Sequence, residues 1–172
     1  MRFGKLVVIL IAAAVEGLAE ETHVRQIVIS IPDKKLVLLE DGDVKKIYPI
    51  AVGKPSTPSP VGTFQIANRV VNPTWFGPKG AVPPGKANPL GTRWMGIGYK
   101  GYGIHGTNAP KSIGKAASHG CIRMRTKDAE ELFKLIAVGD EVQLAAERTE
   151  QIAKLLDEPA AAPATVSTGG AQ

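Results

Sequence analysis

The sequence of 172 residues contains a single cysteine, Cys121, so no intramolecular disulfide framework can hold the fold together. No apolar run reaches the ~20 residues that a membrane-spanning helix needs. The chain lacks internal repeats and has no basic stripe interleaved with aromatic residues, which make up only 5% of it. These absences exclude disulfide-stapled, multi-span and repeat architectures, and we expect no binding of nucleic acid.

The composition is that of a globular protein. Hydrophobic residues make up 44% and charged residues 22% of the chain, which excludes wholesale disorder. The length suits one domain with a substantial core. With 19 glycines and 13 prolines the sequence is rich in turns, which favours a mainly β architecture.

Both ends differ in composition from the middle. Arg2 and Lys5 precede ten apolar residues, 6–15, and small residues follow, so residues 1–19 are predicted to be a signal peptide. A buried strand or helix, or an uncleaved anchor, is the alternative for this run. The chain after residue 19 has a net charge of +4. Residues 159–172, rich in Ala, Pro, Ser, Thr and Gly, are predicted to be a disordered tail.

The middle of the chain begins with a β pattern. Alternating isoleucines at 27–31, an apolar run at 36–39 and a further strand over 44–52 predict a three-stranded antiparallel meander. Asp41-Gly42 is a strong hairpin turn between the last two. A proline-stiffened loop at 57–63 precedes a strand that starts at Phe64.

Residues 72–98 show almost no periodicity and are predicted to be a long loop. Loops of this length in compact domains are usually functional or disordered. Trp75 and Trp94 lie in it or at its end, which favours an ordered surface that covers or binds something, with a flexible insertion as the alternative.

Two helices are expected towards the C-terminus. Thr126 is a plausible N-cap for a helix with one apolar face, which ends at Gly139. The alternation at 141–144 predicts a closing strand. A weaker helix is predicted over 147–156, within a possible C-terminal helical segment at 146–158.

The residues that carry chemistry are concentrated at 101–123. A thiol needs a base or a cation to lower its pKa from ~8.5 before it acts as a nucleophile. His119 lies two residues from Cys121, which in an extended strand places both on one face, whereas His105 needs a neighbouring strand. Spacing leaves the choice of base open. A small buried cysteine and a zinc site formed by His105, His119 and Cys121 are the alternatives, and the zinc site lacks paired ligand spacing and a nearby acidic base.

The motifs Ile104-His105-Gly106-Thr107 and Ser118-His119-Gly120-Cys121-Ile122-Arg123 resemble the signature of the L,D-transpeptidase catalytic domain family. The resemblance covers residues 25–145 and extends to segments 57–64 and 88–91. Arg123 stands where the general pattern often has asparagine. The family implies an L,D-transpeptidase-type β-sandwich with one or two packed helices and a long lid loop.

The resemblance also implies roles for residues. Cys121 would be the nucleophile and His105 the general base, oriented by the carbonyl of Gly106. The amides of His119, Gly120 and Cys121 would form the oxyanion hole. The implied substrate-binding residues are Arg123, Ser118, Tyr102 and Trp94.

The implied activity is a secreted peptidoglycan L,D-transpeptidase, sensitive to carbapenems, that acts in the periplasm or cell wall. The Cys121 thiolate would attack the meso-diaminopimelate carbonyl of a tetrapeptide stem, release D-alanine and transfer the acyl group to an amine. Water or a lipoprotein lysine as acceptor would make a carboxypeptidase or an anchoring enzyme. A non-enzymatic wall-binding module is the alternative of another class. We expect no cofactor and no metal, a monomer, peptidoglycan stem peptides as partners, and membrane contact only through the leader.

Overall fold

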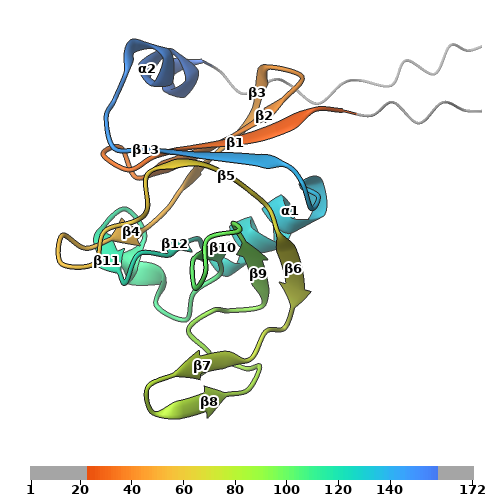
Figure 1. Ribbon diagram of the computed structural model, residues 1–172, viewed down its shortest axis with the longest axis vertical. Coiled ribbons are helices and arrows are strands. Elements are labelled where there is room, and N and C mark those ends of the chain that lie inside the picture. The colour runs from red at the N-terminus through yellow and green to blue at the C-terminus, as the bar shows by residue number, and fades with distance from the viewer. Residues whose placement is uncertain (1–22, 159–172) are drawn as a thin grey trace, which may run out of the picture.

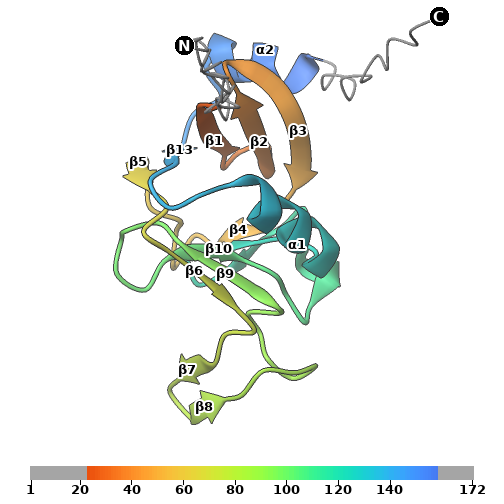
Figure 2. The ribbon, with the colours of Figure 1, turned by 90° about the vertical axis from the view of Figure 1, so that its right-hand side faces the viewer.

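The structure is a computed structural model, and it describes residues 23–158. The predicted signal peptide, 1–19, and the predicted tail, 159–172, lie outside the described residues. Figures 1 and 2 show two sheets, one above the other, with a hairpin at the lower end. The elements are β1 Arg25–Ser30, β2 Lys35–Glu40, β3 Asp43–Pro49, β4 Val52–Gly53, β5 Gly62–Gln65, β6 Asn68–Val71, β7 Trp75–Gly77, β8 Gly80–Val82, β9 Arg93–Gly96, β10 Gly103–His105, the 3-10 turn Pro110–Ser112, β11 Ala116–Ser118, β12 Ile122–Arg123, α1 Thr126–Leu135, β13 Glu141–Ala145 and α2 Glu150–Asp157.

The upper sheet has five strands in the order β3-β2-β1-β13-β5. The predicted meander is confirmed, because β1, β2 and β3 pair antiparallel in sequence order. Asp41 and Gly42 both have positive φ, 55° and 93°, as a tight two-residue hairpin requires. The predicted closing strand is β13, which runs parallel to β1 and antiparallel to β5.

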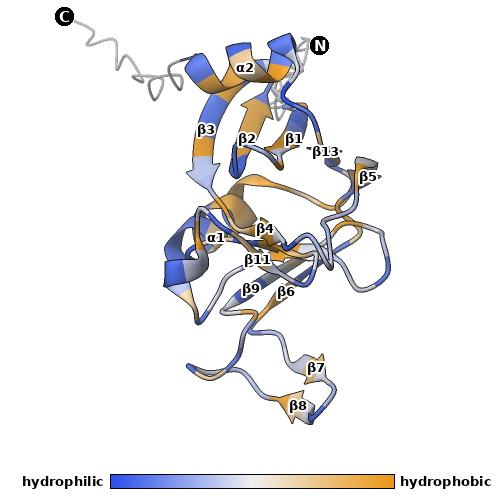
Figure 3. Cartoon of the chain, turned by 90° about the vertical axis from the view of Figure 1, so that its left-hand side faces the viewer, coloured by the Kyte–Doolittle hydropathy of each residue, from blue (hydrophilic) through white to orange (hydrophobic). Residues whose placement is uncertain are grey.

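The lower sheet has four strands in the order β12-β10-β9-β6, and the pair β4-β11 lies beside it. The main core lies between the two sheets, where the inward side chains of β1 and β2 meet Met95, Ile104 and Ile122 from below. A smaller cluster on the outer side of the upper sheet is covered by Ile152 of α2. Hydrophobic and hydrophilic colours alternate along α2 and the strands in Figure 3, as expected of elements with one packed face. The β-sandwich expected from the family resemblance is therefore present.

The prediction of a loop over 72–98 needs correction. This segment contains the hairpin β7-β8 and all of β9, whose Met95 is fully buried. β9 pairs with β6 on one side and β10 on the other. The four-residue strand was missed because it is too short for a periodic pattern, and its ladder is formed with distant segments.

Both predicted helices exist with different bounds. Thr126 is the first residue of α1 rather than its N-cap, because its hydroxyl donates to the carbonyl oxygen of Thr107 (3.4 Å). α1 ends at Leu135, well before Gly139, since Ile136 is already extended. α2 begins at Glu150, where the Thr149 hydroxyl accepts the first-turn N–H of Ile152. Among residues 23–158 no helix is long and apolar enough to span a membrane.

Candidate active site

One face of the lower sheet carries two rows of side chains that cross its four strands. Strand register sets the rows, because laterally paired residues project to the same face. The first row is Val70, Trp94, His105 and Arg123. The second row is Asn68, Gly96 and Gly103, followed by Cys121 just before the start of β12.

This register brings the cysteine and the first histidine together. β10 and β12 run parallel, with Ile104 opposite Ile122 and His105 opposite Arg123. Cys121 therefore lies beside Gly103, on the diagonal from His105, and both side chains project to the face opposite the core. His105 and Cys121 are sixteen residues apart in sequence, and the pairing of β10 with β12 brings them close together. Sequence spacing alone could not reveal this pairing.

The glycines of the second row leave room for the rings of the first. A Cβ on Gly103 would approach the Trp94 indole to 2.7 Å. A Cβ on Gly96 would come within 2.8 Å of the Asn68 amide oxygen. Trp94 consequently spreads over the space between Asn68 and Cys121, stacked on the His105 ring at 5.8 Å with an interplanar angle of 21°.

His105 is buried and held by its own neighbour. Its Nδ1 lies 2.5 Å from the carbonyl oxygen of Gly106, so Nδ1–H donates and Nε2 remains able to accept a proton. Burial lowers the pKa of His105 to about 4, and the Arg123 guanidinium acts in the same direction. The Gly106 carbonyl opposes this shift without cancelling it. The imidazole is thus neutral at physiological pH and oriented as a base.

Cys121 is partly buried, with Sγ 3.5 Å from the carbonyl oxygen of Gly101. Burial raises the pKa of the thiol, because a thiolate loses hydration there. The Gly103 backbone and the Arg123 guanidinium act in the opposite direction. The resting site therefore pairs a neutral thiol with a neutral imidazole.

The segment that presents Cys121 is a bend and not the extended strand considered from the spacing of His119 and Cys121. Gly120 has a φ of +111°, a conformation that glycine adopts without strain. A Cβ there would approach Tyr102 Cε1 to 2.4 Å, so the Tyr102 ring closes over the glycine. His119 is exposed, and within residues 23–158 its side chain forms no hydrogen bond with Cys121.

Ser118 holds this bend from inside. Its hydroxyl donates to the carbonyl oxygen of Cys121 (2.6 Å) and accepts the Gly120 N–H (3.0 Å). Ser118 is 1% exposed, so its hydroxyl is engaged inside the bend and positions the backbone that presents Cys121, whereas its contact with substrate stays a prediction. The Gly120 N–H is occupied by this bond, which leaves the amides of His119 and Cys121 as the unpaired N–H groups among the described residues of the bend.

The remaining predicted contacts lie around this centre. Trp94 and Cys121 line the same cleft, while Tyr102 packs between Tyr99 and Gly120. Arg123 is half-buried and forms no ion pair within residues 23–158.

Asn68 was missed by sequence reasoning. Its Oδ1 accepts the Trp94 indole N–H at 3.0 Å, and its side chain lines the cleft beside Cys121. Asn68 fixes the ring that stacks on His105, so it acts on the site through Trp94. A single asparagine in an unremarkable strand carries no local signal of this role.

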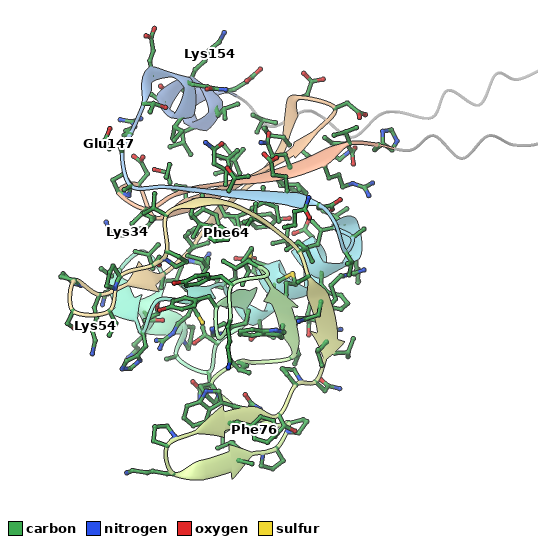
Figure 4. All side chains as sticks on the ribbon, viewed as in Figure 1. Lys34, Lys54, Phe64, Phe76, Glu147 and Lys154 are labelled. Atoms are coloured by element: carbon green, nitrogen blue, oxygen red, sulfur yellow. The ribbon has the colours of Figure 1, made fainter. Side chains whose placement is uncertain are left out.

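The cleft in front of Cys121 has a volume of about 580 Å³. The hairpin β7-β8 forms one wall through Trp75 and Phe76, and Figure 4 shows Phe76 on the hairpin that extends from the sheets. Buried Asn88 holds the hairpin base. Its amide group lies within hydrogen-bond distance of the carbonyl oxygens of Pro73, Val82 and Pro83, and its Oδ1 accepts the Leu90 N–H.

The zinc alternative considered from sequence finds no support in this geometry. Within the part of the chain that the structure describes, no three His, Cys, Asp or Glu side chains are grouped closely enough to hold a metal. His119 is exposed, whereas His105 is buried and Cys121 is partly buried.

The fold and the site together define a β-sandwich domain with an oriented histidine on β10 and a cysteine just before the adjacent strand β12. Residues 24–144 match the L,D-transpeptidase catalytic domain family (YkuD), and the chain belongs to that family. The Bacillus subtilis protein named as the L,D-transpeptidase YkuD is 44% identical over 118 residues, 69% of this chain and 64% of that protein. The chain thus matches under two thirds of that relative's length.

Solved structures of L,D-transpeptidases have a similar fold. A mutant of the Enterococcus faecium L,D-transpeptidase is similar with a TM-score of 0.61 and 27% identity, covering 70% of this chain and 49% of that one. The L,D-transpeptidase LdtMt1, solved in complex with imipenem, shares the fold with a TM-score of 0.62 at 21% identity, over 72% of this chain and 59% of that one.

Proposed function

We propose that this protein is a secreted peptidoglycan L,D-transpeptidase with Cys121 as nucleophile and His105 as general base. The observation that carries the proposal is the strand register, which puts the thiol on the diagonal from an imidazole whose Nδ1 is already bonded to Gly106. Membership of the family and the names of its relatives supply the reaction class.

The first step is removal of the thiol proton. The raised pKa of Cys121 and the lowered pKa of His105 favour the neutral pair over a thiolate–imidazolium pair. The thiolate therefore forms as the substrate carbonyl arrives, with Nε2 of His105 accepting the proton. A neutral resting thiol is also protected from oxidation in an exported protein.

Attack by Sγ on the meso-diaminopimelate carbonyl of a tetrapeptide stem gives a tetrahedral oxyanion. The amides of His119 and Cys121 are the candidates to stabilise it, whereas the Gly120 amide is engaged by Ser118. His105 then returns its proton to the departing D-alanine nitrogen, which leaves a thioester on Cys121. Trp94 and Arg123 flank the base and the nucleophile, where Arg123 would face stem-peptide carboxylates.

The second step transfers the acyl group to an acceptor amine of another stem, which restores the thiol and forms a cross-link. We infer that the hairpin wall, which lines the cleft through Trp75 and Phe76, shields the thioester from water and so favours an amine acceptor. Hydrolysis, or transfer to a lipoprotein lysine, uses the same site and differs only in the acceptor. The substrate places the reaction in the periplasm or cell wall, and the predicted leader would take a monomeric protein there.

The test is cross-linking of purified muropeptides by the wild type and by Cys121→Ala. Loss of the nucleophile is expected to lower turnover by ~10⁴. Mass spectrometry after incubation with a carbapenem is expected to show an adduct on Cys121. Retained cross-linking in the variant, or an unreactive thiol, would contradict the mechanism and favour a wall-binding module.

A pair of histidine variants tests the choice of base. His105→Ala is expected to lower turnover by about 10²–10⁴, the usual range for a general base. His119→Ala removes an exposed ring and is expected to cost far less. The reverse order would show that His119 is the base. Products with and without acceptor separate transpeptidation from hydrolysis.

A further inference from the structure

No acidic residue lies in the central part of the sequence, which contains His105 and Cys121. All 16 Asp and Glu residues lie outside residues 44–127, a stretch of 84 positions. The same stretch contains 13 of the 21 Lys and Arg residues. The other described residues, 23–43 and 128–158, carry 13 acidic and six basic side chains. The net charge is small, but acidic and basic residues are therefore strongly separated along the sequence.

This division in sequence largely follows the two sheets, with the exception of α1, whose acidic residues lie beside the lower sheet. Residues 50–127 build nearly everything below the upper sheet in Figure 1, including β4, β6 to β12 and the hairpin. Figure 4 places Lys54 low, beside β4, and Glu147 and Lys154 at the opposite end near α2. The positive half is thus the half that presents Cys121.

Three exposed or half-exposed lysines lie on the segments next to the bend that presents Cys121, and we call them the cationic rim: Lys54, Lys100 and Lys115. The backbone N–H of Lys54 donates to the backbone carbonyl oxygen of Ser118 (3.1 Å), at the start of the bend that presents the nucleophile. Lys115 precedes β11, and its carbonyl oxygen accepts the Val52 N–H of the neighbouring strand. Lys100 adjoins Gly101, whose carbonyl oxygen contacts Sγ of Cys121.

No member of the cationic rim forms an ion pair within residues 23–158. The acidic residues of α1, nearest to this half in sequence, are already engaged: Asp128 with Arg125 (3.9 Å), Glu131 with Lys46 (2.8 Å) and Glu130 with the Thr92 hydroxyl (2.6 Å). Within residues 23–158 the charges of the rim are therefore not compensated by direct ion pairs.

We infer that the cationic rim is an electrostatic docking surface for the carboxylate groups of the peptidoglycan network, outside the reacting stem. This inference rests on the proposed function, under which the substrate is a polymer with repeating carboxylates. Like-signed charge around a cleft raises the local concentration of an oppositely charged ligand. Because Lys54 and Lys100 belong to the segments that contact the bend and the thiol of Cys121, the polymer that they attract arrives at the catalytic cleft. The chain would thereby stay near successive stems without a separate wall-binding module among residues 23–158.

The test measures binding in a Cys121→Ala background, so that turnover does not intervene. Purified peptidoglycan, stripped of attached phosphate polymers, is sedimented with the protein at several salt concentrations. Lys54→Glu with Lys115→Glu is expected to weaken binding about tenfold at low salt and to flatten its salt dependence. The matched control, Lys134→Glu with Lys154→Glu, makes the same change in net charge outside the 44–127 stretch and is expected to bind as before.

A second experiment, chemical modification of the peptidoglycan, identifies the group that the lysines bind. Converting the carboxylates of the peptidoglycan to neutral amides is expected to abolish the salt-dependent binding. Equal loss in both double variants would assign the effect to net charge and overturn the inference. Binding that survives amidation, or that appears only with inorganic polyphosphate, would also overturn it. Wild-type turnover of a soluble stem peptide is measured separately, and its absence would refute the proposed function while leaving the binding result interpretable.

Discussion

The buried imidazole of His105 makes a quantitative prediction about stability. Burial lowers its pKa from 6.5 to about 4. Between these values the unfolded chain binds a proton that the folded protein does not, so the free energy of unfolding falls as pH falls. At about 1.4 kcal/mol per pH unit over roughly 2.5 pH units, the free energy of unfolding falls by about 3.5 kcal/mol in total, and most of this is lost by pH 4.5. Above pH 6.5 the His105 imidazole is neutral in both the folded and the unfolded protein, so it no longer lowers the free energy of unfolding.

The measurement is urea denaturation at pH 7.0 and 4.5 of the wild type and of His105→Asn, whose amide can still donate to the Gly106 carbonyl. Wild type is expected to lose about 2–3 kcal/mol more than the variant on acidification. The exposed ion pair of His23 with Asp41 is present in both proteins and cancels in the difference. His119→Asn is the control and is expected to follow the wild type. Equal acid sensitivity of wild type and His105→Asn would refute the buried neutral imidazole.

Two further predictions concern the supports of the site. Gly120→Ala combines a positive φ with a clash against Tyr102, so it is expected to cost about 1–3 kcal/mol more than Gly114→Ala in thermal denaturation, since Gly114 has a positive φ in open space. Similar costs would disprove the packing of Tyr102. Asn68→Ala frees the Trp94 indole and is expected to lower kcat about tenfold, while Asn68→Asp, which keeps the acceptor, is expected to restore most of it. A change in KM alone would argue that Asn68 only contacts substrate.

Much of the upper sheet was predictable because its signals are local. Alternating isoleucines and the Asp41-Gly42 turn specify β1 to β3 with little outside help. β9 was missed since a four-residue strand acquires its identity from pairing with β6 and β10. The N-terminus of α1 was misplaced because the Thr126 hydroxyl bonds to a residue remote in sequence.

The sequence by itself determined the candidate residues of the site, since a single cysteine among glycines and two histidines left few residues that could carry the chemistry. Its motifs indicated the family. Only the tertiary structure decided how they are arranged. The β10-β12 register brings His105 beside Cys121, whereas the bend at Gly120 leaves His119 in solvent and turns Ser118 inward. The physical reason is that a base is defined by distance, orientation and burial, and a strand ladder between remote segments sets all three.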